Sequence, residues 1–137
     1  MIRRLLRLLK RFGMFLDFPL INVTIWTREQ GDVTVLYVDG PMHYDIGGST
    51  LGKDIEKLIA QGKAKIVIDC SRAKIHSEVV EELVRLKKKA QSIPKGDIKL
   101  LQVGRGSTDQ WARKKIKQST LENLDGTEDA AVDSFLY

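Results

Sequence analysis

The side chains with the greatest chemical potential stand together in His76-Ser77-Glu78, directly before a segment of helical periodicity. A serine beside a histidine could be a nucleophile, a phosphate acceptor or a helix cap. Adjacent residues at a helix start rarely aim at one point, and the sequence shows no orienting acid or oxyanion loop, so we exclude a catalytic pair. A helix N-terminus both favours negative charge and needs a capping group. Ser77 as a phosphate acceptor and Ser77 as a plain N-cap therefore both remain open.

Other reactive groups point to weaker sites. His43 and His76 could approach each other, but without a placed carboxylate or cysteine they predict solvated loop histidines and no metal. Gly104-Arg105-Gly106 lacks the third glycine and the lysine of nucleotide-binding loops. The basic run 113–117 favours a solvated helix face over contact with nucleic acid. Cys70 is the only cysteine, so we expect a small buried side chain, no disulfide and a reducing, cytoplasmic setting.

The elements that must position Ser77 can be read on both sides of it. Ile66-Val67-Ile68 is a short β-branched run typical of a buried strand, and Asp69, Ser71 and Arg72 are predicted to end it. From Ser77 apolar residues recur every three or four positions, which predicts an amphipathic helix: Val79, Val80, Leu83, Leu86 and Ala90. Ser77 would then lie at the carboxyl end of a strand, where open α/β sheets usually place function.

The rest of the chain predicts one α/β domain, since 137 residues suffice for a single core. We expect a hairpin of strands 23–27 and 33–38 turning at Gly31-Asp32, with Asp39-Gly40-Pro41 ending the second strand. Further elements follow in order: a helix capped by Ser49 or Thr50 and closed by Gly62, a strand over 98–103, a helix introduced by the capping box 107–110, a short strand within 120–124, and a helix from Thr127. This order predicts a mixed sheet of four to five strands with helices packed on it.

The net charge of +5 is concentrated in the first twelve residues. Removing the five basic residues found there from the total of 23 leaves 18, which balance the 18 acidic residues. Wound as a helix, this segment separates into a basic arc of roughly 120° and an apolar arc of roughly 160°. The basic arc holds Arg3, Arg4, Arg7, Lys10 and Arg11, and the apolar arc holds Ile2, Leu5, Leu6, Leu8, Leu9 and Phe12.

The domain boundaries follow from this arm. Residues 1–13 form the predicted amphipathic arm, 14–22 a linker containing Pro19, and 23–137 the globular domain. Charges interrupt every apolar run, so the arm fits neither a transmembrane span nor a secretory signal. It is typical of a helix that lies on an anionic membrane surface or docks in a partner's groove. Packing on its own domain and a cleavable organelle-targeting role are the alternatives.

With the elements in this order, the chain from about Val23 to Phe135 resembles a STAS domain, the fold of bacterial anti-sigma factor antagonists. In that family an I-V-L-D-L-type strand leads to I-D-S-S-G-L-G at a helix start. Here Ile66–Cys70 matches the strand, and Ile75–Glu81 lies over the signature. Gly96–Leu101 matches a downstream family strand, and Glu128–Phe135 matches the last helix.

The resemblance implies a non-enzymatic regulatory module without a cofactor, small-molecule substrate or nucleic acid. Family members bind a serine-kinase anti-sigma factor, and phosphorylation of the signature serine, here Ser77, breaks the complex. We therefore expect a cytoplasmic protein with partner contacts in two segments: Met42, His43, Tyr44 and Asp45 in one, and His76, Ser77, Glu78 and Glu81 in the other. The alternative is a peripheral STAS-type subunit of a membrane-associated complex, such as a transporter ATPase partner, docked at the cytoplasmic face through its N-terminal helix.

Several signature positions differ from the family pattern. The family aspartate before the serine is His76, the second serine is Glu78, and Gly-Leu-Gly is Val79-Val80-Glu81. Glu78 would repel an incoming phosphate, or could itself hold a permanent negative charge at this helix terminus. Two forms of the hypothesis remain open: a kinase-regulated switch at Ser77 and a constitutive interaction module.

Overall fold

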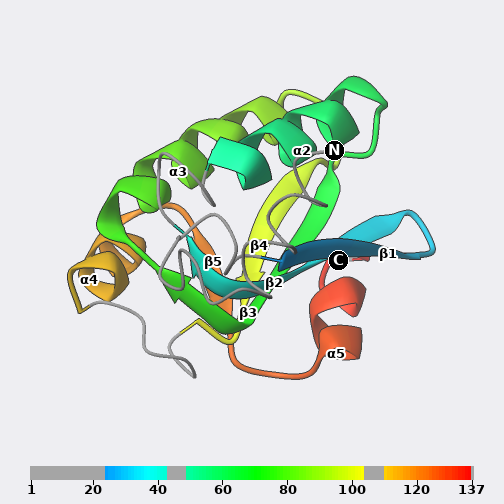
Figure 1. The fold of residues 1–137 in the computed structure, drawn as a ribbon. Coiled ribbons are helices and arrows are strands. Elements are labelled where there is room, and N and C mark those ends of the chain that lie inside the picture. Colours follow the sequence, from blue (N-terminus) through cyan, green and yellow to red (C-terminus); the bar gives the residue numbers. More distant parts are fainter. Residues whose placement is uncertain (1–23, 43–48, 104–109, 137) are drawn as a thin grey trace, which may run out of the picture.

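The structure is a computed structural model and describes residues 24–42, 49–103 and 110–136, with five strands and four helices (Figure 1). The elements in chain order are β1 (Thr24–Gln30), β2 (Val33–Met42), α2 (Ser49–Ala60), β3 (Lys65–Ile75), α3 (Ser77–Gln91), β4 (Asp97–Leu101), α4 (Gln110–Gln118), β5 (Glu122–Leu124) and α5 (Glu128–Asp133). The predicted arm and linker, the loop residues His43, Tyr44 and Asp45, and all but the last residue of the predicted capping box lie outside the described residues.

The five strands form one mixed sheet in the order β1-β2-β3-β4-β5. β1 pairs antiparallel with β2 through a two-residue loop, and Gly31 in that loop has a φ of 64°, which glycine adopts without steric cost. The pairs β2–β3, β3–β4 and β4–β5 are parallel. This arrangement confirms the predicted mixed α/β sheet with helices packed on it.

Helices cover the two faces of the sheet unequally, as Figure 1 shows. Alternate residues of the central strands, such as Ile66 and Ile68 in β3, pack beneath α2, α3 and α4 in the main core. Val67 between them faces the opposite side, where it packs in a smaller cluster that includes Ala131 of α5. The period of two in the strands therefore assigns each apolar side chain to one of two layers.

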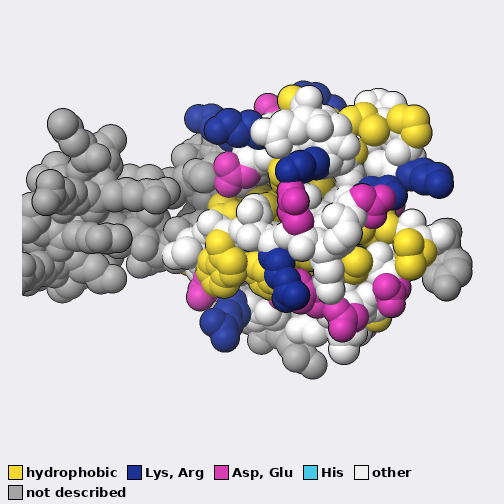
Figure 2. Space-filling model, turned by 90° about the vertical axis from the view of Figure 1, so that its right-hand side faces the viewer, with side chains coloured by type: hydrophobic (Ala, Val, Ile, Leu, Met, Phe, Trp, Pro, Cys, Tyr) yellow, Lys and Arg dark blue, Asp and Glu magenta, His cyan; other side chains and the backbone are white. Residues whose placement is uncertain are grey.

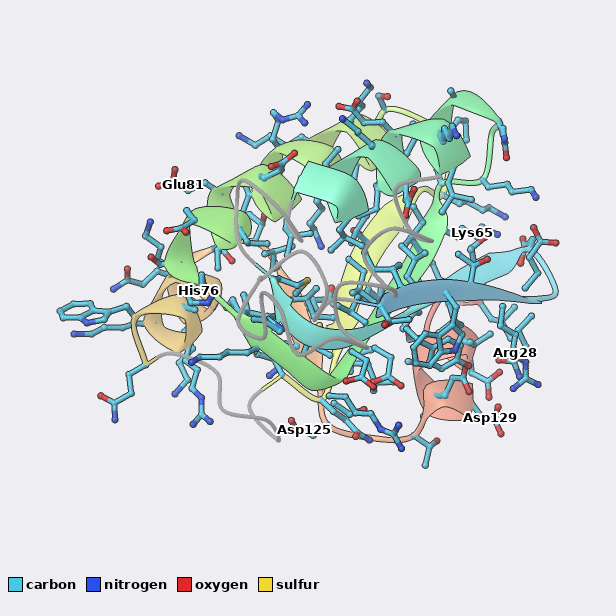
Figure 3. The ribbon with its side chains drawn as sticks, in the orientation of Figure 1. Arg28, Lys65, His76, Glu81, Asp125 and Asp129 are labelled. Carbon is cyan, nitrogen blue, oxygen red and sulfur yellow. The ribbon has the colours of Figure 1, made fainter. Side chains whose placement is uncertain are left out.

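The short helix α5 is held by polar contacts from both ends. Thr127 caps it, since its Oγ1 accepts a hydrogen bond from the Ala130 N–H at 3.2 Å. The Tyr37 hydroxyl donates to Glu128, and Lys99 of β4 donates to the Ser134 hydroxyl at 2.9 Å. These contacts fasten α5 to β2 and β4, and Figure 3 shows Asp129 of the same helix close to Arg28 of β1.

Two strands extend further than predicted. β3 continues past Asp69 to Ile75, and β2 runs through Gly40 and Pro41 to Met42. The pairing shifts by one residue between Tyr37↔Asp69 and Asp39↔Arg72, which is a β-bulge on β3. The Asp69 carboxylate accepts a hydrogen bond from the Ser71 N–H at 2.9 Å, so the polar residues are accommodated in the bulge and do not end the strand.

The remaining boundaries differ by smaller amounts. β1 extends beyond Thr27 to Gln30, and β4 ends at Leu101 because Gln102 adopts a left-handed φ of 56°. α2 begins at Ser49, the first of the two residues predicted to cap this helix. The closure of α2 at Gly62, the strand β5 and the buried Cys70 are as predicted.

Candidate partner-binding surface

β3 and α3 place Ser77 at the first position of a helix. Ile75, the last residue of β3, is fully buried, and His76 follows in an extended conformation as the N-cap residue. The Val79 N–H bonds to the His76 carbonyl at 3.0 Å and starts the helix. The interpretation of Ser77 as the N-cap is therefore wrong by one position, and the partly exposed Ser77 belongs to the first turn.

The buried side of α3 determines which residues face outward. Val79, Val80 and Leu83 are at most 2% exposed and pack on the sheet. Glu78 and Glu81 are exposed on the other side of the helix, and Figure 3 shows His76 and Glu81 at the same end of α3. Four of the predicted contact residues thus lie at one end of α3: His76, Ser77, Glu78 and Glu81.

Met42, the last residue of β2, is the one member of the second predicted segment that the structure describes. It pairs with Ile75, the last residue of β3 before α3 begins. The Met42 side chain is fully buried in the main core. Met42 therefore anchors the start of that segment and does not offer its side chain to a partner.

Helix α4 adds residues that the sequence reasoning did not assign to this surface. Lys115 Nζ lies 3.0 Å from Glu81 Oε1, which joins α4 to the start of α3. Trp111 is 70% exposed, and Lys114 Nζ lies 5.7 Å from the centre of its ring. A tryptophan next to the basic face of a short amphipathic helix was the signal that could have identified it. We call Ser77, Glu78, Glu81, Trp111, Lys114 and Lys115 the α3–α4 surface.

The α3–α4 surface combines acidic residues on α3, basic residues on α4 and one large exposed aromatic ring. Tryptophan is enriched at protein interfaces, whereas lysine and glutamate are more typical of their polar rim. The exposed Glu81–Lys115 pair contributes little to stability and is available for exchange with a partner's charges. Figure 2 shows a different face of the molecule, the one at the right-hand side of Figure 1. On that face basic and acidic side chains are interspersed and neither sign prevails.

Burial and the neighbouring Asp69 charge raise the pKa of the Cys70 thiol well above its ordinary range. Among residues 24–42, 49–103 and 110–136, no cluster of three or more His, Cys, Asp or Glu side chains could hold a metal ion. Within the same ranges, no helix has the length and apolar character needed to cross a membrane.

The sequence matches no protein-family model and has no detectable relative among curated proteins. The fold, however, is similar to solved anti-sigma factor antagonists. Unphosphorylated SpoIIAA matches with a TM-score of 0.62 at 17% identity, covering 81% of this chain and 96% of its own. The Bacillus cell fate determinant SpoIIAA in its phosphorylated form matches with a TM-score of 0.64 at 19% identity, and the match covers 81% of this chain and 98% of that structure. An anti-sigma factor antagonist from Mycobacterium paratuberculosis matches with a TM-score of 0.61 at 18% identity, and the match covers 84% of this chain and 95% of that structure.

These likenesses define the class of fold. The chain has the STAS fold of the anti-sigma factor antagonists, and the match extends over nearly the whole length of those structures. The resemblance predicted from Ile66–Cys70 and Ile75–Glu81 is confirmed at the level of the fold. At 17–19% identity the roles of individual residues remain predictions.

Proposed function

We propose that this chain is a non-enzymatic regulatory protein of the anti-sigma factor antagonist type. It binds a kinase-like anti-sigma factor through the α3–α4 surface. The observation that carries the proposal is the position of Ser77, which is partly exposed in the first turn of α3 on a STAS fold. The two solved forms of SpoIIAA, unphosphorylated and phosphorylated, support a modification-dependent role for this class of fold.

Control at Ser77 has a direct physical basis. Phosphorylation would add nearly two negative charges and three acceptor oxygens beside Glu78, in the middle of the proposed interface. The positive end of the α3 dipole favours the added phosphate, whereas the Glu78 carboxylate opposes it. Phosphorylation of Ser77 should therefore be less favourable than with an uncharged neighbour. Once formed, the phosphoserine would make the α3–α4 surface negative, because its two acidic and two basic side chains otherwise balance.

Trp111 is the proposed anchor of the interface. Exposed tryptophans often account for about 2 kcal/mol or more of binding free energy when a partner buries them. The second tryptophan of the chain, Trp26, is 44% exposed and stacks on Tyr37 at a centroid distance of 5.7 Å. Since Trp26 lies on β1 and not on the α3–α4 surface, Trp26→Ala is the matched control for Trp111→Ala.

The proposal is tested by capture of the full-length protein from its own host, followed by mass spectrometry of bait and partners. Recovery of an ATPase-like anti-sigma factor, with phosphate on Ser77 in part of the bait, supports it. The complex should be lost with Trp111→Ala and kept with Trp26→Ala. Recovery of membrane-complex subunits with Ser77 unmodified contradicts the switch. We expect no turnover on generic ester, phosphate or nucleotide substrates.

The second candidate function rests on the amphipathic pattern of residues 2–12, with basic and apolar residues on opposite arcs. In this alternative the chain is a peripheral subunit of a membrane-associated assembly, docked by that segment at the cytoplasmic face. A variant lacking residues 1–13 should then fail to localise or assemble. Localisation and assembly like those of the full chain would exclude this role.

A further inference from the structure

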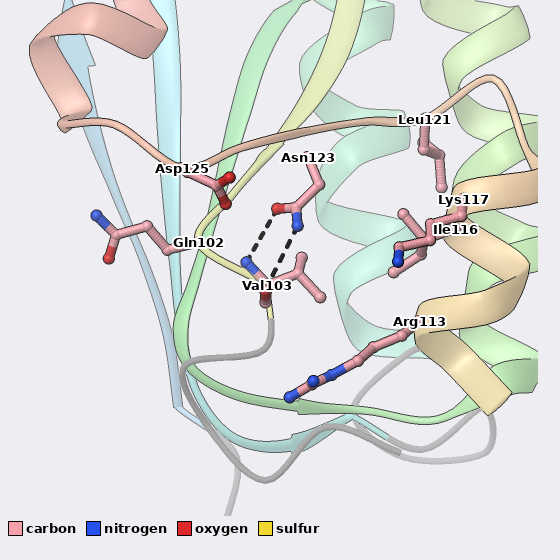
Figure 4. Close-up of a pocket in the computed structure, with 8 residues that line it drawn as sticks. All are labelled: Gln102, Val103, Arg113, Ile116, Lys117, Leu121, Asn123 and Asp125. Carbon is pink, nitrogen blue, oxygen red and sulfur yellow. Dashed lines mark hydrogen bonds between the residues drawn. The ribbon is translucent and has the colours of Figure 1, made fainter. Parts of the chain in front are cut away.

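A hollow of about 680 Å³ opens between α4 and the ends of β4 and β5 (Figure 4). Its lining residues are Gln102, Val103, Arg113, Ile116, Lys117, Leu121, Asn123 and Asp125. The volume falls within the usual range of small-molecule sites, roughly 300–1,000 Å³. The hollow lies at the carboxyl ends of the parallel strands β4 and β5.

The strand side of the hollow is held in place by hydrogen bonds. The Asn123 amide bonds the Val103 backbone twice, with its oxygen accepting from the Val103 N–H at 3.0 Å and its nitrogen donating to the Val103 carbonyl at 3.4 Å. Gln102 donates through Nε2 to the Gly126 carbonyl at 2.8 Å. These bonds order the wall before any ligand arrives, which lowers the entropic cost of binding.

The backbone of this wall carries an unusual conformation. Gln102 has a φ of 56°, in the left-handed region that a residue with a side chain rarely adopts. Its N–H bonds to the Leu124 carbonyl at 2.7 Å, so the conformation is maintained by the neighbouring strand end. Such conformations gather at ligand-binding and active sites, and this one lies in the wall of the hollow.

The two sides of the hollow differ in charge. Arg113 and Lys117, one helical turn apart on α4, line one side, and Figure 4 shows Arg113 extending toward the end of β4. Asp125 lies on the opposite side, with Asn123 between. Ile116 and Leu121 supply apolar surface. Arg and Lys together suit a phosphate group, and a carboxylate suits hydroxyl donors.

We propose that this hollow is a binding site for a small hydroxylated phosphate ester, such as a sugar phosphate. Arg113 and Lys117 hold the phosphate, and Asp125 accepts hydrogen bonds from hydroxyl groups. The site is separate from the α3–α4 surface, because Lys114 contacts the Trp111 ring and Lys115 pairs with Glu81. It therefore does not depend on the proposed regulatory role.

The test is calorimetric titration of the full-length protein with ribose 5-phosphate, glucose 6-phosphate and adenosine 5′-monophosphate. Ribose, glucose, adenosine and inorganic phosphate are titrated beside them. The double variant Arg113→Ala/Lys117→Ala removes the cations of the hollow. Lys114→Ala/Lys115→Ala removes the same charge from the same helix outside the hollow and is the matched control. Amide resonances of Val103 and of the Asn123 side chain report binding locally.

We expect at least one ester to bind saturably and to shift those resonances. The Arg113→Ala/Lys117→Ala variant should raise its dissociation constant by about tenfold or more, and the control variant by less than about twofold. Absence of saturable binding for all three esters would overturn the proposal. An equal rise in the dissociation constant for the two double variants would also overturn it, because the hollow would then have no special role. Inorganic phosphate binding as tightly as the esters would overturn it too, because the protein would then recognise negative charge alone.

Discussion

The buried ion pair of Lys87 and Asp97 holds α3 against β4. Replacing Asp97 should lower the free energy of unfolding more than replacing Lys87. Lys87 Nζ lies 2.8 Å from Asp97 Oδ1, and the two side chains are 4% and 20% exposed. Lys87 also lies 3.4 Å from the Ile98 carbonyl. The carboxylate, in turn, accepts from the Ile98 N–H at 2.8 Å. The carboxylate keeps a protein partner and some water if the lysine is lost, whereas the ammonium group is nearly enclosed.

The magnitudes follow from this difference in burial. Asp97→Asn leaves a buried ammonium group without its counter-charge and should lower the free energy of unfolding by about 3 kcal/mol. Lys87→Met removes the buried charge, fills a similar volume and should cost about 1 kcal/mol. Adding Lys87→Met to Asp97→Asn should recover part of the loss, because no uncompensated cation then remains.

Urea unfolding followed by far-ultraviolet circular dichroism measures these differences, with an unchanged slope as the sign of a two-state comparison. Glu56→Gln is the control, since it disrupts an exposed pair in which Arg85 lies 3.0 Å away and the side chains are 56% and 39% exposed. It should cost less than about 1 kcal/mol. A smaller loss for Asp97→Asn than for Lys87→Met, or no recovery in the double variant, would refute the reasoning.

Three further predictions concern Gly96, Cys70 and Tyr37. Gly96→Ala should destabilise by about 2 kcal/mol or more in the same urea assay, because its Cβ would lie 2.0 Å from the Ala90 carbonyl oxygen; a loss near zero would contradict the packing there. Cys70 should react with a thiol reagent only after unfolding, since burial raises its pKa, so rapid labelling of the native protein would be inconsistent with the fold. Burial, then the hydrogen bond to Glu128, raises the pKa of Tyr37 above its ordinary 10.0. The corresponding stability is fully present below pH 10.0 and is lost as pH rises toward the folded-state pKa, and Tyr37→Phe should abolish this dependence in alkaline unfolding titrations.

Local pattern was sufficient to predict the elements around Ser77. The run beginning at Ile66 is short and β-branched, which favours a strand, and the three- and four-residue spacing from Val79 to Ala90 is the period of a helix. The end of β3 was not predictable in this way. The bulge after Asp69 depends on how β3 pairs with β2. From the sequence alone, a polar side chain that accepts a hydrogen bond from the nearby backbone cannot be distinguished from one that ends a strand.

The candidate surface was predicted only in its α3 half, for a related reason. His76, Ser77 and Glu78 are neighbours in sequence, so a motif could indicate them together. Trp111 joins them only through the packing of α4 on α3, which no local period reports. Likewise, Met42 was expected to contact a partner, but its side chain is fully buried in the main core.

The affinity of the captured partner for Ser77→Asp tests the central claim most directly. Ser92→Asp is the matched control, because it adds the same charge just beyond the opposite end of α3, where Ser92 is exposed. Our account predicts that Ser77→Asp raises the dissociation constant by about tenfold or more and that Ser92→Asp changes it by less than about twofold. Equal affinity of the unmodified protein and the Ser77→Asp variant for the partner would contradict the account.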